Sequence, residues 1–226
     1  MTEQQPMARD AAFSYECHAC KRCCHDKLIQ VNPYEIARMA RNRGISTTEF
    51  IERYLSEQGP YLRFLDNTAC VFLTEQGCGV HPDRPLVCRL YPLGRFRSAE
   101  GNEHFTHLTP HPQSEGIYGE SGTIADFLAG QNITDFVAAA DEYLALFYRM
   151  YDALQKGDMA GQASDDTPAD ASSPIPLDIT QEWLDLDAAI KRYCTERKII
   201  EPSELSERLK LHITIIDSKL ELAKES

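Results

Sequence analysis

Apolar residues recur at helical spacing in several stretches of the chain. The pattern predicts a first helix from Pro33 to Arg43, which Gly44 ends. Ser46 and Glu49 then match a capping box, so a second helix should follow at once. The apolar positions that give these two helices a buried face are Ile36, Met39, Ala40, Phe50, Ile51, Tyr54 and Leu55.

The longest helical pattern lies between residues 133 and 154. Its apolar positions alternate steps of four and three residues, and they are Ile133, Val137, Ala140, Leu144, Phe147, Tyr151 and Leu154. Such a stripe packs on the protein's own core or forms a coiled-coil dimer, and we favour the core because the stripe has the minimum length for a coiled coil. Two further helices are predicted after residue 176, with apolar positions at Ile179, Trp183, Leu186, Ile190 and Tyr193, and at Leu209, Ile213, Ile216 and Leu220.

Short apolar runs at residues 61–65, 70–73 and 104–108 predict strands or extended loops. Residues 157–176 contain mainly small, polar and acidic residues, which is typical of a linker. Together the patterns predict a mainly helical α+β fold in three parts. These are a cysteine-rich domain with its packing helix at 15–156, a flexible linker at 157–176, and a C-terminal helical segment at 177–226.

The charge and the N-terminal sequence narrow the class of protein. The formal net charge is -12, yet residues 17–98 hold twelve Lys and Arg against eight Asp and Glu. This local excess is too small to indicate a nucleic-acid partner. Residues 1–16 contain no apolar run of signal-peptide length, and no stretch approaches a transmembrane span. We therefore expect a cytoplasmic protein with no membrane partner.

Seven of the eight cysteines fall within residues 17–88, and they are Cys17, Cys20, Cys23, Cys24, Cys70, Cys78 and Cys88. The first four form the run C-x2-C-x2-C-C. Two-residue spacing lets two thiolates face one centre from a tight turn. Adjacent cysteines cannot easily share one ion, so either Cys23 or Cys24 is spare or the two serve different centres. In a reducing cytosol such a cluster binds metal or does redox chemistry more often than it forms disulfides, and we favour metal.

Basic residues flank the cysteines, and they are Lys21, Arg22, Lys27, Arg84, Arg89, Arg95 and Arg97. Thiolates around a metal ion leave a negative centre, which nearby cations offset. His18 and His81 also lie beside cysteines and could complete a site. We leave out the histidines at 104, 107 and 111, since an extended segment would not place them on one face. Cys194 lies far from the cluster in the sequence, and we predict that it is a small buried side chain.

Three segments carry a family resemblance: CHACKRCC from Cys17, ACVFL around Cys70, and GCGVHPDRPLVCRLYPLG from Gly77. In spacing and order they resemble the YkgJ family of bacterial cysteine-cluster proteins, described as zinc- or iron-chelating domains. The resemblance spans roughly residues 15 to 98 and implies metal chelation without an agreed reaction. A more remote similarity to the cysteine-bearing flagellin lysine methylases implies an enzyme as the alternative.

The spacing also bears on the metal. C-x2-C-x2-C offers three corners of a [4Fe-4S] cluster, which a distant fourth cysteine could close. A zinc site usually shows two separated C-x2-C pairs, and here there is one such region. We therefore expect an iron-sulfur cluster ahead of zinc, in a small cysteine-cluster domain followed by packed helices.

The predicted function is metal binding through the seven cysteines. The alternative is a cluster-dependent enzyme, such as one catalysing protein-modifying methyl transfer, for which the sequence assigns no catalytic residue. The C-terminal helices are a candidate surface for a protein partner.

Overall fold

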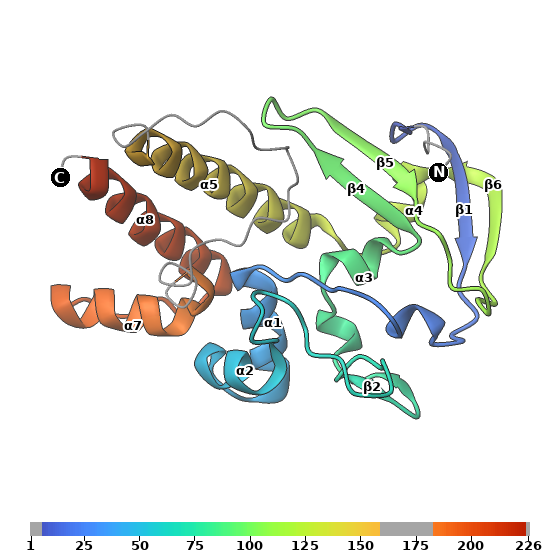
Figure 1. The fold of residues 1–226 in the computed structure, drawn as a ribbon, viewed down its shortest axis with the longest axis horizontal. Helices are drawn as coiled ribbons and strands as arrows, with labels where there is room; N and C mark the ends of the chain where they lie inside the picture. The colour runs from blue at the N-terminus through green and yellow to red at the C-terminus, as the bar shows by residue number, and fades with distance from the viewer. Residues whose placement is uncertain (1–5, 159–182, 225–226) are drawn as a thin grey trace. The chain divides into compact units, whose positions relative to one another are not determined.

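The computed structural model describes residues 6–158 and 183–224 (Figure 1). Contacts between residues divide the chain into two units. The first unit comprises Met1–Val31 and Tyr54–Val137, and the second comprises Asn32–Arg53 and Ala138–Ser226.

Antiparallel strand pairs form the framework of the first unit. They are β1 (Ala12–Glu16) with β6 (Ile117–Thr123), β2 (Leu73–Thr74) with β3 (Gly77–Cys78), and β4 (Leu93–Arg97) with β5 (Glu103–His107). The β4–β5 pair keeps one register throughout, whereas the register of β1 and β6 shifts between Ala12 and Ser14. Figure 1 shows β4–β5 and β1–β6 as separate two-stranded ribbons.

The apolar core of the first unit includes the contact between β1 and α4 (Ile124–Ala129). Phe13 of β1 is buried, and its ring meets that of Phe127 edge-on with 5.1 Å between centroids. Thr123 and Asp126 form a capping box that begins α4. Other fully buried side chains of this unit are Leu93, Phe105, Ile124 and Leu128.

Short helical turns carry two of the cysteine segments of the first unit. They are the 3-10 turns η1 (Arg22–Cys24) and η2 (His81–Asp83) and the helix α3 (Leu86–Leu90). Arg89 of α3 is only 4% exposed. Its guanidinium donates to the carbonyls of Arg84 and Gln131, each at 3.0 Å, and to that of Pro82. It also lies 4.0 Å from the centroid of the Phe136 ring, so this one cation joins several loops of the unit.

The second unit is helical where it is described. Its helices are α1 (Pro33–Arg43), α2 (Thr47–Tyr54), α5 (Thr134–Asp158, from Ala138 onward), α7 (Leu186–Arg197) and α8 (Leu205–Lys224). Asn32 and Glu35 form a capping box at the start of α1, with Pro33 in its first turn. Gly44 ends α1 in the left-handed conformation, at φ 68°.

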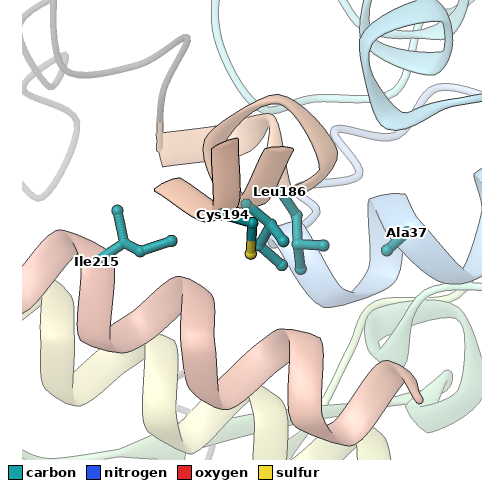
Figure 2. Close-up of a cluster of buried hydrophobic side chains, with 5 residues drawn as sticks. Ala37, Leu186, Cys194 and Ile215 are labelled. Carbon is teal, nitrogen blue, oxygen red and sulfur yellow. The ribbon is translucent and has the colours of Figure 1, made fainter. Parts of the chain in front are cut away.

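A small hydrophobic cluster joins α1, α7 and α8 (Figure 2). Its buried members are Ala37, Leu186, Ile190, Cys194 and Ile215. Cys194 is thus a core residue, as the sequence predicted.

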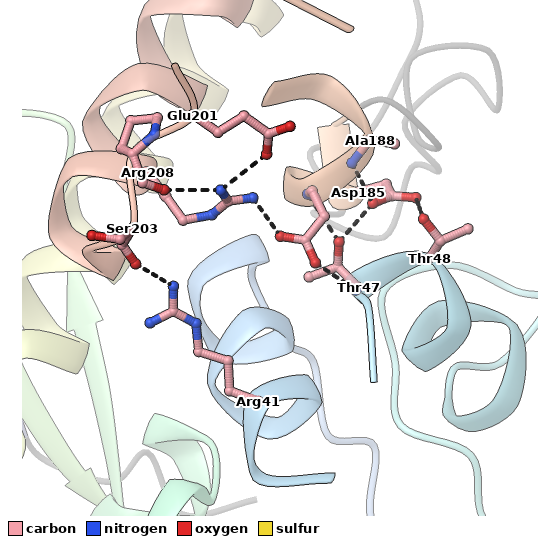
Figure 3. Close-up of polar contacts among 10 residues, drawn as sticks. Arg41, Thr47, Thr48, Asp185, Ala188, Glu201, Ser203 and Arg208 are labelled. Carbon is pink, nitrogen blue, oxygen red and sulfur yellow. Dashed lines mark hydrogen bonds and ion pairs between the residues drawn. The ribbon is translucent and has the colours of Figure 1, made fainter. Parts of the chain in front are cut away.

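Polar contacts reinforce the same helices (Figure 3). The buried Thr47 hydroxyl donates to Asp185 Oδ1 at 2.6 Å and accepts from the backbone amide of Asp187 at 2.9 Å. Asp185 also caps α7 by accepting from the Ala188 amide. Arg208 of α8 then pairs with Asp187 at 2.7 Å, so one chain of contacts runs from the start of α2 through α7 to α8.

The buried face of α5 differs from the predicted one. Residues Val137, Ala140, Leu144 and Phe147 are half-buried and Tyr151 is exposed. The stripe that is buried runs instead through Phe136, Ala139, Tyr143, Leu146 and Met150. Tyr143 shifts the stripe because its hydroxyl has a buried partner, His212 Nδ1 of α8, at 2.9 Å.

The predicted fold class, mainly helical α+β, is confirmed. Helices 33–43 and 46–55 and the last two helices occur close to their predicted positions, and the 104–108 run forms β5. Residues 61–65 and 70–73 make isolated bridges and turns, apart from Leu73, which begins β2. Strands β1, β4 and β6 were not predicted, because their glycines and charged residues hide the alternation of apolar and polar positions.

The predicted linker, 157–176, lies outside the described residues from position 159 onward, and residues 157 and 158 belong to α5. Likewise Ile179 of the predicted third helical stripe falls outside them. In the part of the chain that the structure describes, no helix has the length and apolar character needed to span a bilayer.

Candidate metal centre

All seven clustered cysteines lie in the first unit as free thiols. Cys17 follows β1 and is exposed, and the other six are half-buried. They lie on the loop into η1, within η1, on a turn, on β3 and on α3, and they are Cys20, Cys23, Cys24, Cys70, Cys78 and Cys88.

Backbone hydrogen bonds join the first cysteine run to the later ones. The amide of Cys70 donates to the carbonyl of Cys24 at 2.8 Å, and the amide of Asp26 donates to the carbonyl of Thr68 at 3.1 Å. Cys70 in turn accepts from the amide of Leu73, which pairs with Cys78 in the β2–β3 ribbon. Cys24, Cys70 and Cys78 are therefore held in one set of neighbouring turns.

The backbone around these cysteines adopts an uncommon conformation. Ala19, Lys21, Asp26 and Thr68 have left-handed φ values of 53°, 63°, 51° and 65°. Each of these non-glycine residues lies within two positions of a clustered cysteine. Such a conformation costs about 1 kcal/mol or more per residue and tends to occur at functional sites.

The Sγ atoms of Cys23 and Cys24 lie 4.0 Å apart, at which distance one thiol can donate a hydrogen bond to the other. The hydrogen bond from Cys24 lowers the pKa of Cys23 to about 7, and the charges of Lys27 and Arg84 lower it further against the effect of burial. The same hydrogen bond raises the pKa of Cys24, as do burial and the negative charges of Cys23, Cys88 and Cys70. Of the two, Cys23 is therefore the thiol that loses its proton first.

Cys70 and Cys78 repeat one local arrangement. Burial raises the pKa of both thiols, whereas a backbone amide two residues further along lowers it, that of Phe72 for Cys70 and that of Val80 for Cys78. Amides that donate to sulfur stabilise a thiolate, as they do around metal-bound cysteines. Both sulfurs are thus prepared to carry negative charge once their protons leave.

The flanking cations divide into two groups. Arg84 lowers the pKa of both Cys23 and Cys78, and Lys27 that of Cys23, so these two act on the thiols as the sequence predicts. Arg89 is instead held by carbonyl groups, and Arg95 pairs with Glu103. Lys21 donates to the carbonyl of Glu75, which ties the first run to the β2–β3 turn.

The histidines take separate positions. His18 Nε2 lies 3.1 Å from Glu16 Oε1, and His81 Nδ1 lies 3.3 Å from a guanidinium nitrogen of Arg84. Burial lowers the pKa of His81, and the charges of Arg84 and Arg89 lower it further. His81 therefore stays neutral, the form in which imidazole binds metal.

Sequence reasoning missed three tyrosines that gather beside the first cysteine run. The ring of Tyr15 meets those of Tyr91 and Tyr118 edge-on, at 6.1 Å and 5.2 Å between centroids. Burial raises the pKa of Tyr15 to about 12, and interactions with Tyr91, Cys17 and Cys23 add to this effect. One signal was available, since Tyr91 belongs to the CRLYP segment that carried the family resemblance.

The donor set fits a thiolate-bound metal. Six half-buried sulfurs, amides that face two of them and two cations that lower thiol pKa values are the chemistry that zinc and iron-sulfur centres use. Within the residues that the structure covers, no three His, Cys, Asp or Glu side chains are already spaced as ligands of one ion.

Residues 16–110 match the model of a protein family described as "CxxCxxCC: Putative zinc- or iron-chelating domain". The match includes all seven cysteines, and it confirms the resemblance drawn from their spacing. No protein of curated function and no solved structure matches the chain. Residues 16–110 are therefore similar to domains of the zinc- or iron-chelating CxxCxxCC type.

Proposed function

We propose that the CxxCxxCC domain at residues 16–110 holds a metal centre through thiolates drawn from both ends of the domain. The ligands come from Cys17, Cys20, Cys23, Cys24, Cys70, Cys78 and Cys88. Within this set, Cys23, Cys24, Cys70, Cys78 and Cys88 form the inner group, because the charges of these five thiols affect one another's pKa values.

The observation that supports the proposal most strongly is the environment of Cys24. Its thiol interacts electrostatically with Cys23 beside it, with Cys70 on the following turn and with Cys88 on α3. Neighbouring thiolates in a half-buried site repel one another. A bound cation removes that repulsion, which gives these sulfurs a physical reason to lie together.

The metal that we propose first is iron, as a [4Fe-4S] cluster, with zinc as the alternative. Four of the thiolates would hold the cluster, and it would supply one-electron transfer or a Lewis-acidic iron. Seven candidates exceed the four ligands of either centre, so some cysteines are left for a second role. The thiols remain reduced in a compartment such as the cytoplasm, where we place the protein.

Metal analysis of the full chain tests this proposal. Protein purified without oxygen should contain about four irons and four sulfides per chain and show broad visible absorption. A colourless protein with one or two zinc ions per chain, even after reconstitution with iron and sulfide, would show that the metal is zinc and not iron. Protein that takes up neither metal would contradict the proposal.

A further inference from the structure

Two tyrosine hydroxyls of the first unit are buried without a partner. Among the described residues, the hydroxyl oxygens of Tyr91 and Tyr118 are enclosed and have no hydrogen-bond partner in suitable geometry. A buried hydroxyl without a partner destabilises the folded state, so a fold seldom keeps two together unless something else satisfies them.

These two hydroxyls lie on the side of the first cysteine run. Tyr91 interacts electrostatically with Cys23 and Cys20, and Tyr118 interacts with Tyr91 and Tyr15. The Ser114 hydroxyl and the backbone at His111 lie near Tyr91 and lower its pKa against the larger effect of burial, but neither meets the Tyr91 hydroxyl in hydrogen-bond geometry. The rings of Tyr91 and Tyr118 both contact that of Tyr15, and of the two hydroxyls that of Tyr91 is the one that interacts with the thiols.

The tyrosines are neutral donors. Burial raises the pKa of Tyr118 to about 12, and it raises the pKa of Tyr91 as well. A neutral phenol next to a thiolate donates its proton into a hydrogen bond, and thiolates bound to metal are good acceptors of such bonds.

We infer that Tyr91 and Tyr118 are positioning residues of the metal centre, in which Tyr91 donates a hydrogen bond to the Cys20 or Cys23 thiolate and Tyr118 donates to Tyr91. The inference rests on the proposed function. It gives the Tyr91 hydroxyl a thiolate partner that forms when metal binds, and it makes the Tyr91 oxygen the acceptor for Tyr118.

Loss of either tyrosine hydroxyl should leave the metal-free protein as stable or more stable, but should weaken metal binding. In the metal-free protein, Tyr91→Phe and Tyr118→Phe remove an unsatisfied hydroxyl, so the melting temperature should stay the same or rise. With zinc bound, the same changes remove a donor to sulfur, so affinity should fall by about 10-fold for Tyr91→Phe and less for Tyr118→Phe.

Tyr143→Phe is the matched control. The Tyr143 hydroxyl is also buried, but it has a partner in His212, at 2.9 Å, and it lies in the second unit. This change should lower the melting temperature of the metal-free protein and leave zinc affinity within twofold of wild type.

Zinc affinity is measured on the full chain by competition with a chromophoric chelator. In the cobalt-substituted protein, loss of the hydrogen bond should move the thiolate-to-metal charge-transfer band to lower energy, which a purely structural role would not do. Zinc affinities within twofold of wild type in both tyrosine variants, or losses of stability like that of Tyr143→Phe, would overturn the inference. If Tyr91→Phe does not fold, the zinc affinity and stability of Tyr118→Phe test the inference. A wild-type chain that binds no zinc or cobalt would instead refute the proposed function, and the inference with it.

Discussion

The backbone amide of Cys70 donates a hydrogen bond of 2.8 Å to the carbonyl of Cys24, which joins the first cysteine run to the later cysteines. The bond does not depend on a ligand, because it lies in the main chain. The fold therefore brings together the two segments that the family resemblance had only placed in order along the sequence.

Replacement of either of these cysteines should remove metal. Cys24→Ser and Cys70→Ser each delete a proposed ligand, so we expect the bound metal per chain to fall by more than half. Cys194→Ala is the control, since Cys194 lies in the core of the second unit. It should cost about 1 kcal/mol of stability and keep the metal. Full metal content in both serine variants would show that the inner group is wrongly assigned.

Loss of Arg89 should destabilise the first unit. Arg89→Met leaves the carbonyls of Arg84, Gln131 and Pro82 without their buried donor, so the free energy of unfolding should fall by about 3 kcal/mol. Arg53→Met is the control, because Arg53 makes one exposed pair with Glu49 and should cost less than about 0.5 kcal/mol. Urea unfolding measures both, and equal losses would contradict the role given to Arg89.

The contacts of Thr47 should stabilise the second unit alone. Thr47→Val keeps the shape of the side chain but leaves Asp185 Oδ1 without its 2.6 Å donor. We expect a loss of about 2 kcal/mol in the free energy of unfolding, with unchanged metal content. Loss of metal in this variant would show that the second unit is needed to hold the centre.

Gly116 should be intolerant of a side chain. A Cβ at this position would lie 2.0 Å from the Tyr15 hydroxyl oxygen. Gly116→Ala should therefore displace Tyr15 and cost about 1–3 kcal/mol in thermal unfolding. Gly130 is the matched control, because its backbone is right-handed helical and its nearest neighbour would lie at 3.5 Å. If Gly116→Ala is as stable as Gly130→Ala, the packing around Tyr15 is looser than described.

The helices were predictable from the sequence because each carries a local signal. Asn32, Pro33 and Gly44 mark the limits of α1 by capping chemistry that needs no distant partner. The buried face of α5 was not predictable in this way, since Tyr143 is buried only because His212 of α8 satisfies its hydroxyl. Choosing between two adjacent helical stripes requires knowledge of that tertiary contact.

The candidate site was predictable in composition but not in arrangement. Spacing alone identified the seven cysteines and the nearby cations. It could not show that Arg84 acts on two thiols while Arg89 is held by carbonyls, because the division depends on how the loops around α3 fold. The tyrosines could not be predicted for a similar reason, since β1 and β6 bring Tyr15 and Tyr118 together only in the folded chain.

Differential alkylation of the cysteines tests the metal centre most directly. The metal-loaded chain is treated with an alkylating reagent before and after chelation, and the modified residues are identified by mass spectrometry. We predict that Cys23, Cys24, Cys70, Cys78 and Cys88 are protected with metal and become reactive after its removal, whereas the buried Cys194 is equally protected in both states. Equal reactivity of these five cysteines with and without metal would contradict a thiolate-bound centre in this domain.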